Sequence, residues 1–130
     1  MFVYICWIEF DFVSGCRFPL VNSKAMLFLN KLSNYFISWL IRFIFKVKVI
    51  DSQSGMMVFR KDILKKIKVQ NKGMGLSQEF KIKAWLNPNI KCSELHISYY
   101  PRLGRVKFNK IRDGIKNLYD VLILWQKLEK

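Results

Sequence analysis

The stretch from residue 25 to residue 47 constrains the fold of this chain more than any other part of the sequence. It consists mainly of Leu, Phe, Ile and Trp, but Lys31 and Arg42 interrupt it. A membrane-spanning helix needs roughly 20 consecutive apolar residues with few charges, and the longest uncharged run here covers only residues 32–41. The pattern therefore predicts an amphipathic, basic helix that either lies in a membrane interface or packs in a protein core.

The composition indicates a folded domain with an anionic partner. The chain has 130 residues, of which 52% are hydrophobic and 15% aromatic, so it has enough apolar side chains for a core and is not disordered. Its net charge is +14. Such a charge favours an anionic membrane surface, a phosphorylated ligand or nucleic acid. We expect no nucleic acid, because the sequence contains no nucleic-acid-binding motif.

Neither a zinc site nor a signal peptide is predicted. Cys6, Cys16 and Cys92 form no paired motif, and together with the single His96 they match no zinc-binding spacing. We therefore expect reduced thiols. The opening MFVYICWI is apolar but short, and it lacks the basic start of a signal peptide. Residues 1–9 are interpreted as an atypical, replaced or misread start.

Strand and helix patterns alternate along the chain, which indicates an α/β fold. Strands are expected at residues 10–14, ending at Gly15, and at residues 56–59 and 91–99. Helices are expected at residues 24–45 with Ser23 as a cap, at residues 62–68, around the repeat of Leu76, Phe80 and Ala84, and from Asn109 onward.

The last strand and the last helix have clear patterns. The strand places Leu95, Ile97 and Tyr99 on one side and Glu94, His96 and Ser98 on the other, which is typical of a half-buried strand. The helix carries an apolar stripe of Ile111, Ile115, Leu118, Leu122 and Trp125, and Val121, Ile123 and Leu124 widen the apolar surface near its end.

Two polar segments are candidate ligand sites. The first is DSQSG (residues 51–55), where Gly55 would let a ligand approach the backbone closely; the alternative is an ordinary Asx-type turn. The second is PRLGRVKF (residues 101–108), in which Arg102, Arg105 and Lys107 surround a glycine. Guanidinium groups hold phosphate well, and the alternative is a solvated basic loop.

Five segments, taken in order, resemble the later half of glycosyltransferase family 2. They are SGCRF (14–18), DSQSGMMVFRKDIL (51–64), GMGLSQEF (73–80), SELHISYYPRLGRVKF (93–108) and NKIRDGIKNL (109–118). The similarity is closest to the dolichol-phosphate mannosyltransferase-like and polyprenyl-phosphate glycosyltransferase branch. It covers residues 10–121, and residues 122–130 end the C-terminal helix. The resemblance implies an incomplete nucleotide-diphospho-sugar transferase (GT-A-like) fold with only its later strands and C-terminal helices.

The resemblance also implies an activity. The chain would be a remnant or fragment of an enzyme that transfers a sugar from a nucleotide-sugar to a polyprenyl (dolichyl-type) phosphate. It would act as a peripheral protein on the cytoplasmic face of a membrane. In that reading Asp51 orients the loop or the acceptor, or acts as a base. The residues expected to bind the acceptor and its phosphate are Arg17, Gln53, Ser54, Arg102, Arg105 and Lys107.

An important part of the family pattern is missing. The Asp-x-Asp motif and the earlier βα units, which hold the nucleotide and a divalent cation (Mg²⁺ or Mn²⁺) in the family, have no counterpart here. Glu9 and Asp11 have a similar spacing, but the family places its motif upstream of this strand. We therefore expect no metal and no cofactor in this chain, and no activity without a missing N-terminal half. The alternative is a non-catalytic basic module that binds a membrane surface or another protein.

Overall fold

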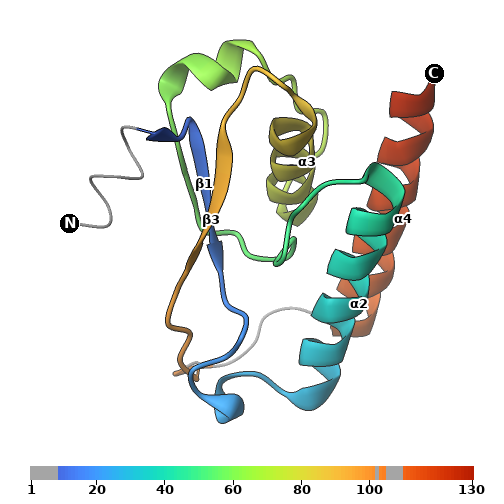
Figure 1. Ribbon diagram of the computed structural model, residues 1–130. Helices are drawn as coiled ribbons and strands as arrows, with labels where there is room; N and C mark the ends of the chain where they lie inside the picture. The colour runs from blue at the N-terminus through green and yellow to red at the C-terminus, as the bar shows by residue number, and fades with distance from the viewer. Residues whose placement is uncertain (1–8, 102, 105–109) are drawn as a thin grey trace.

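The computed structural model describes residues 9–101, 103–104 and 110–130 (Figure 1). Within these residues the chain forms a small α/β fold with three α-helices and a three-stranded mixed sheet, which confirms the expected class. The elements, with η for a 3-10 helix, are β1 (Phe12–Cys16), η1 (Ser23–Ala25), α2 (Phe28–Phe45), β2 (Met57–Phe59), η2 (Lys61–Lys65), α3 (Met74–Leu86), β3 (Cys92–His96) and α4 (Lys110–Glu129).

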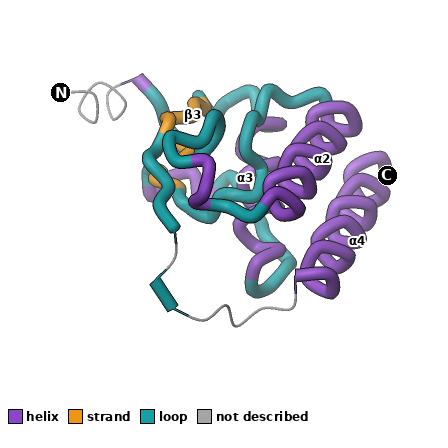
Figure 2. The backbone as a smooth tube through the Cα atoms, turned by 90° about the horizontal axis from the view of Figure 1, so that it is seen from below, coloured by secondary structure: helices purple, strands orange, loops and turns teal. Residues whose placement is uncertain are grey.

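The sheet has the order β2-β1-β3, with β1 in the centre. β2 is antiparallel to β1, with Val58 opposite Val13, and β3 is parallel to β1, with Cys92 opposite Phe12. All three α-helices lie on the same side of the sheet (Figure 1). α2 and α4 run side by side in an outer layer, and α3 lies between them and the sheet (Figure 2).

β1 begins and ends later than the sequence predicts. The predicted strand covers residues 10–14 and ends at Gly15, whereas β1 continues to Cys16. Gly15 belongs to the strand because its neighbours need the space above it: a side-chain Cβ there would lie 2.9 Å from Ile97 Cδ1 and 3.2 Å from Met56 Cβ. The glycine therefore permits close packing across strands and does not mark a turn.

The helix predicted over residues 24–45 is interrupted near its start. The first residues form η1, and its cap is Asn22, whose Oδ1 accepts a hydrogen bond from Lys24 N at 3.0 Å. The expected cap, Ser23, is instead the first residue of η1. The chain is then extended for two residues before α2 begins at Phe28.

α3 is close to its prediction, because its apolar repeat faces the sheet. Phe80 and Ala84 are buried, although Leu76 is 44% exposed. The helix stops before Asn87-Pro88, since proline disfavours helical backbone at the residue before it. β2 covers the last three of the four strand residues predicted at 56–59, and the helix predicted at residues 62–68 is the single turn η2.

α4 buries residues that widen its predicted apolar surface more deeply than the predicted stripe itself. Val121 and Leu124 are 1% and 5% exposed, because they pack into the core between α2 and α3. Four members of the predicted stripe remain between 37% and 76% exposed: Ile111, Ile115, Leu122 and Trp125. The helical period is correct, but the apolar surface of α4 is wider than the surface that the rest of the fold covers.

Two apolar clusters join the layers. The cluster between α2, α3 and α4 contains Ile37, Ile41, Phe45, Val47, Val49, Ile82, Val121 and Leu124. The cluster between the sheet and α3 contains Phe12, Ile63, Ile67, Phe80, Ala84 and Ile90. Together they hold the loop after α2, which contains the polar segment at residues 51–55, between the sheet and the helices.

Candidate functional site

The polar segment after α2 lies at the centre of a hydrogen-bonded group that we call the Asp51 network. Its members come from the end of β1, from α2, α3, β3 and α4, and from the segment itself. They are Arg17, Ser38, Asp51, Ser52, Gln53, Ser54, Lys81, Glu94 and Asn117. Every long element that surrounds the segment therefore contributes at least one side chain to holding it.

Asp51 and Arg17 form the central ion pair. Arg17 Nε donates to Asp51 Oδ2 at 2.7 Å, and Nη2 donates to Oδ1 at 2.9 Å. The backbone N–H of Arg17 adds a bond of 3.0 Å to Oδ2, and Gln53 N donates to Oδ1 at 3.2 Å. The Asp51 side chain is 0% exposed and that of Arg17 12% exposed. The guanidinium also lies over the Tyr99 ring, 5.4 Å from its centroid.

These contacts keep Asp51 charged. Burial by itself raises the pKa of this carboxyl group, but the hydrogen bonds and the positive charge of Arg17 outweigh it and hold the pKa below its usual value. The carboxylate contacts protein donors on both oxygens, and neither oxygen reaches solvent. In this arrangement Asp51 can orient the segment, whereas a proton acceptor for a bound ligand would need an accessible oxygen.

Lys81 is the second buried cation of the network. Its side chain extends from α3, is 0% exposed and donates to the carbonyl oxygens of Asp51 at 2.9 Å and Ser54 at 2.8 Å. Burial lowers its pKa to about 8, although the nearby carboxylates of Asp51 and Glu94 oppose this shift. Lys81 thus ties α3 to both ends of the polar segment.

β3 is shorter than the strand predicted at residues 91–99, and Glu94 shows which of its sides faces the helices. The alternation along the strand is present, but the polar side faces the helices. Glu94 accepts from the backbone N–H of Ile50 at 2.6 Å and of Asp51 at 3.0 Å. The reason is that these two amides need an acceptor at the end of the loop. Leu95 and Ile97 consequently face the side of the sheet away from the α-helices.

Hydroxyl and amide groups complete the network. Ser38 Oγ, from the buried side of α2, lies 3.0 Å from Ser52 Oγ and accepts from Ser52 N at 3.1 Å. Gln53 Nε2 donates to Ser52 Oγ at 3.0 Å, and Asn117 Nδ2 of α4 donates to Gln53 Oε1 at 3.2 Å. The predicted site residues Arg17, Asp51, Gln53 and Ser54 are therefore brought together.

Open space remains on one side of the segment. Gly55 is exposed, and a side chain added there would meet no atom within 4 Å. The other predicted phosphate-binding residues, Arg102, Arg105 and Lys107, lie outside the described residues. Leu103, inside the same segment, is fully exposed.

The residues considered as metal ligands have other partners. Asp11 Oδ2 accepts from Lys91 N at 2.9 Å, and His96 Nε2 lies 2.7 Å from Pro19 O. Cys16 and Cys92 are free thiols whose pKa values burial raises, that of Cys92 to about 12, and Cys6 lies outside the described residues. In the described ranges, no group of three His, Cys, Asp or Glu side chains forms a metal site.

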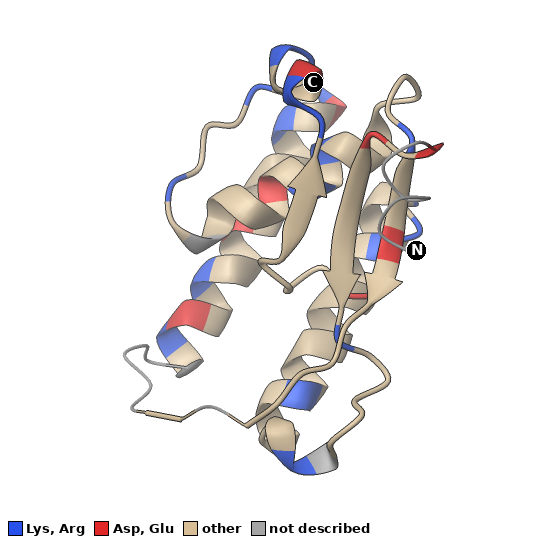
Figure 3. Cartoon of the chain, turned by 90° about the vertical axis from the view of Figure 1, so that its left-hand side faces the viewer, with Lys and Arg blue, Asp and Glu red and all other residues tan. Residues whose placement is uncertain are grey.

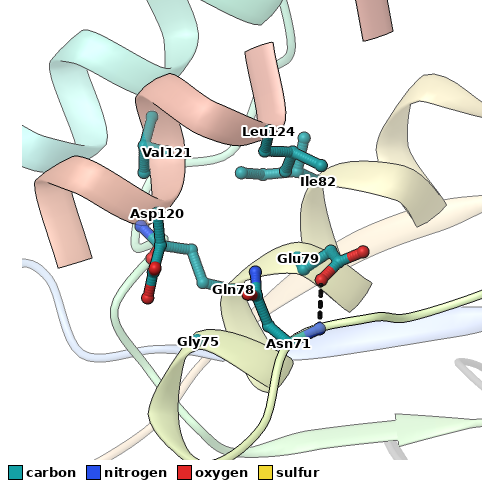
Figure 4. Close-up of a pocket in the computed structure, with 8 residues that line it drawn as sticks. All are labelled: Asn71, Gly75, Gln78, Glu79, Ile82, Asp120, Val121 and Leu124. Carbon is teal, nitrogen blue, oxygen red and sulfur yellow. Dashed lines mark hydrogen bonds between the residues drawn. The ribbon is translucent and has the colours of Figure 1, made fainter. Parts of the chain in front are cut away.

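A shallow hollow, partly open to solvent and too small to enclose a ligand, lies between α3 and α4 (Figure 4). Its lining residues are Asn71, Gly75, Gln78, Glu79, Ile82, Asp120, Val121 and Leu124. Glu79 is engaged, because it accepts from Asn71 N at 2.9 Å and pairs with Lys83 at 2.7 Å. Gln78 Nε2 is buried without a partner in the described structure. None of these residues belongs to the predicted site.

The outer face of α2 is an exposed apolar surface. It consists of Phe28, Leu29, Leu32, Tyr35, Phe36, Trp39 and Phe43, which are 39–75% exposed. Phe36 stacks on Trp39, and Trp39 stacks on Phe43, with ring centroids 6.2 and 5.6 Å apart. The opposite side of the same helix carries the buried residues Ile37, Ser38, Ile41 and Phe45. α2 is therefore both a core helix and an exposed apolar surface.

Basic residues accompany this face. Lys24, Lys46 and Lys48 flank the two ends of α2 and are exposed, and Lys and Arg residues occur in the chain at both ends of the molecule (Figure 3). Arg42 directs one nitrogen back to the carbonyl oxygens of Val49 and Ile50. No helix in the described part of the chain is long and apolar enough to cross a membrane.

Sequence reasoning missed Ser38, Lys81, Glu94 and Asn117. One signal was available for Lys81: it lies between Phe80 and Ile82, next to the apolar repeat that faces the sheet. A charged residue so close to a buried stripe needs an internal partner. The other three are polar residues on helices and strands whose inward direction only the packing reveals.

Comparison of the chain with known protein families, with curated proteins and with solved structures gave no match to any of them.

Proposed function

We propose that this chain is the acceptor-side half of a family 2 glycosyltransferase with an incomplete GT-A-like fold. The complete enzyme would transfer a sugar from a nucleotide-sugar to a polyprenyl phosphate at a membrane surface. The order of the five segments that resemble this family supports the proposal. So does an α/β arrangement in which a polar segment, DSQSG, follows an apolar helix and is hydrogen-bonded to its inner side through Ser38.

The outer face of α2 is the observation that carries the proposal. A polyprenyl phosphate has a charged head on a long apolar chain, so its enzyme has to meet the bilayer surface. Exposed aromatic side chains next to Lys24, Lys46 and Lys48 suit an amphipathic helix that lies in an anionic interface. Ser38, on the inner side of the same helix, contacts the Asp51 network, so α2 would link the lipid surface to the polar segment.

The residues have separate roles in this proposal. Asp51 orients the polar segment through Arg17, and we assign it no role as a base, because its oxygens are enclosed. A phosphate monoester is largely a dianion at neutral pH, with a second pKa near ~6, and so needs no strong base to attack. Gln53 would contact the acceptor. Ser54, which is 3% exposed, would hold the segment in place through Lys81, and Arg102, Arg105 and Lys107 would contact the phosphate. No step is assigned to a divalent cation, because the described residues do not form a site for one.

Vesicle binding tests the membrane part of the proposal. The chain should sediment with vesicles of phosphatidylcholine and phosphatidylglycerol at low salt, and less with phosphatidylcholine alone. Phe36→Glu and Phe43→Glu should each reduce binding by about tenfold or more, since a charge would enter the apolar interface. Leu64→Glu, at a similarly exposed apolar side chain of η2, is the matched control. Equal vesicle binding by all variants would show that the outer face of α2 does not contact the membrane.

Reconstitution tests the catalytic part. The chain alone should bind no nucleotide-sugar, and fusion to the nucleotide-binding half of an intact family 2 enzyme should give sugar transfer to a polyprenyl phosphate. Arg102→Lys keeps the charge but loses the planar fork of the guanidinium, so transfer should fall about tenfold or more. Lys110→Ala should have little effect. Equal rates for Arg102→Lys and the parent fusion would mean that residues 101–108 form only a basic loop.

A non-catalytic membrane-surface module is the second candidate. One observation favours it: the charges of Arg17 and Lys81 are matched by those of Asp51 and Glu94, so the network is already neutral without a ligand. Both candidates predict vesicle binding. They differ in the fusion experiment, where the module would bind vesicles normally but transfer no sugar.

A further inference from the structure

β2 leaves one edge of the sheet open. At the end of the strand, the N–H of Arg60 donates to the carbonyl oxygen of Asp11 at 2.9 Å. In an antiparallel pair, residues bonded to the partner alternate with residues that point away from it. Phe59 and Met57, one and three steps from Arg60, therefore direct their N–H and C=O groups away from β1. Among the described residues, no strand pairs with this edge.

The open edge is short, with three residues in β2, but those residues lack the other features that usually prevent strand addition. Natural edge strands are blunted by charged side chains, proline or bulges. Residues 56–59 are Met-Met-Val-Phe, without charge or proline, and their register with β1 is regular. Met56 is 62% exposed and Val58 is 50% exposed. The backbone and side chains of β2 are thus both available to a further strand.

One face of the sheet also lacks a helical layer in the described structure. Met57 and Phe59 pack toward α3, so Val58 between them points to the opposite face. Ile97 and Met56 meet above Gly15 on that same face. All three α-helices lie on the other side (Figure 1). Sheets made only of parallel strands are usually covered on both faces, and the mixed sheet here contains one parallel pair, β1 and β3.

We infer that the open edge of β2 and the face formed by Val13, Met56, Val58 and Ile97 dock a strand–helix unit of a second, acidic polypeptide. Its strand would extend the sheet beside β2, and its helix would cover the apolar face. The inference rests on the proposed function in one respect: a missing nucleotide-binding half would be built from such units.

The charge of the chain selects this occupant over a second copy. Where β2 ends, Lys61 is exposed and Arg60 lies 3.9 Å from Asp11 and 3.6 Å from Asp62. A second copy would bring another net charge of +14 to the same interface. Like charges at an interface oppose association, whereas an acidic partner gains from complementarity. A strand contributes main-chain hydrogen bonds along the edge, and alternate side chains give the pairing its register.

Hydrogen exchange on the full 130-residue chain tests the inference. The probe is the nucleotide-binding half of an intact family 2 glycosyltransferase, produced as a separate polypeptide that ends before the strand matching β1. In the chain alone, the amides of Met57 and Phe59 should exchange freely, while the Val58 amide, which faces β1, is already protected. Addition of the probe should slow exchange at Met57 and Phe59 by at least about tenfold.

Two variants locate the contact. Val58→Lys places a charge on the uncovered face at a half-exposed side chain, so the fold should persist while probe affinity falls about tenfold or more. Val21→Lys is the same substitution at a side chain that is 64% exposed in the loop before η1, and it should leave affinity unchanged. Met57→Pro removes an outward N–H but no bond to β1, and it should also weaken binding.

Four results would overturn the inference. Protection of Met57 and Phe59 in the dilute chain alone would mean that the chain covers its own edge. Protection that grows with chain concentration would identify a second copy as the occupant. Binding of the probe without this protection would place it elsewhere, and absence of binding would leave the surface without this partner. Sugar transfer separates the two proposals: a protected complex without transfer contradicts only the catalytic function, and transfer without protection contradicts only the docking surface.

Discussion

The Asp51 network and the outer face of α2 distribute polarity in opposite ways. In the network, Asp51 and Lys81 are fully buried, and each has hydrogen-bonding partners. On the outer face, Phe28 and Phe43 are 75% and 70% exposed, although they are among the most apolar side chains of the chain. A buried charge is tolerated when it is paired, so folding alone can complete the network. An exposed apolar face is completed only by something outside the chain.

The largest predicted effect comes from breaking the network. Asp51→Asn removes the negative charge that Arg17 and Lys81 share and leaves both cations buried without full compensation. We expect the free energy of unfolding to fall by about 3–5 kcal/mol, measured by urea denaturation. Asp62→Asn is the control, because its pair with Arg60 is exposed and should change stability by no more than ~1 kcal/mol. Equal effects of the two substitutions would mean that the buried contacts of Asp51 add no more to stability than an exposed ion pair.

The two sides of α2 can be compared within one helix. Ile41→Ala empties a fully buried position and should cost on the order of 3 kcal/mol. Phe43→Ala removes a larger side chain from the outer face and should change stability by only about 0.5 kcal/mol. Thermal or urea unfolding in the absence of lipid measures both. A large loss from Phe43→Ala would show that the outer face is covered in the free protein.

The pKa of Lys81 predicts a pH dependence that the outer face lacks. Its value of about 8 lies below the ~10.4 of an unfolded lysine, so the unfolded chain binds more protons between these two values. The contribution of Lys81 to the free energy of unfolding therefore rises with pH in that window, by about 1 kcal/mol per pH unit. Cys92 opposes it, because its raised pKa makes the native state lose stability at alkaline pH.

The difference between the parent and Lys81→Met isolates this contribution, since Cys92 is present in both. Unfolding measured from pH 7 to pH 10 should show that difference growing with pH above about 8. Lys65→Met, at an exposed position of η2, should give a flat difference. A flat difference for Lys81→Met as well would mean that Lys81 titrates normally in the native state.

The smallest effect concerns the link between α4 and the network. Asn117→Ala removes the 3.2 Å hydrogen bond to Gln53 and should cost about 1 kcal/mol. Hydrogen exchange should become faster along α4 but not along β1. Lys116→Ala, at the exposed neighbouring position, should change neither quantity. Unchanged exchange in Asn117→Ala would mean that apolar packing alone holds α4.

The elements were more predictable than their orientation. The α/β class, the helix that became α3 and the presence of all three strands follow from residue periodicity, because the spacing of apolar residues reports the backbone repeat. The observed element boundaries differ from the predicted ones where packing outweighs the local preference of a residue. Gly15 belongs to β1 because Ile97 occupies the space where a side chain of residue 15 would lie. α4 shows the limit of the method, since its apolar residues occupy more of the helix surface than the core uses, and the pattern predicts the period but not the buried side.

The site was predictable in part for a similar reason. A polar segment in an apolar chain marks a place where the backbone needs special partners, so residues 51–55 could be identified from the sequence. Arg17 was identified only through the family resemblance. Glu94 and Lys81 could not be assigned to the network from the sequence, because each is separated from Asp51 by at least 30 residues. The residues around them do not indicate which side chain they would contact.

The sequence by itself determined an α/β chain with a basic, apolar helix too interrupted to span a membrane and a polar segment after it. Those features depend on local spacing and on residue chemistry. Only the tertiary structure decided that Asp51 is enclosed by Arg17, that the polar side of β3 faces inward, and that one side of α2 is buried while the other stays exposed. The physical reason is that burial and charge pairing are properties of contacts between distant segments, and a contact exists only when the chain has folded.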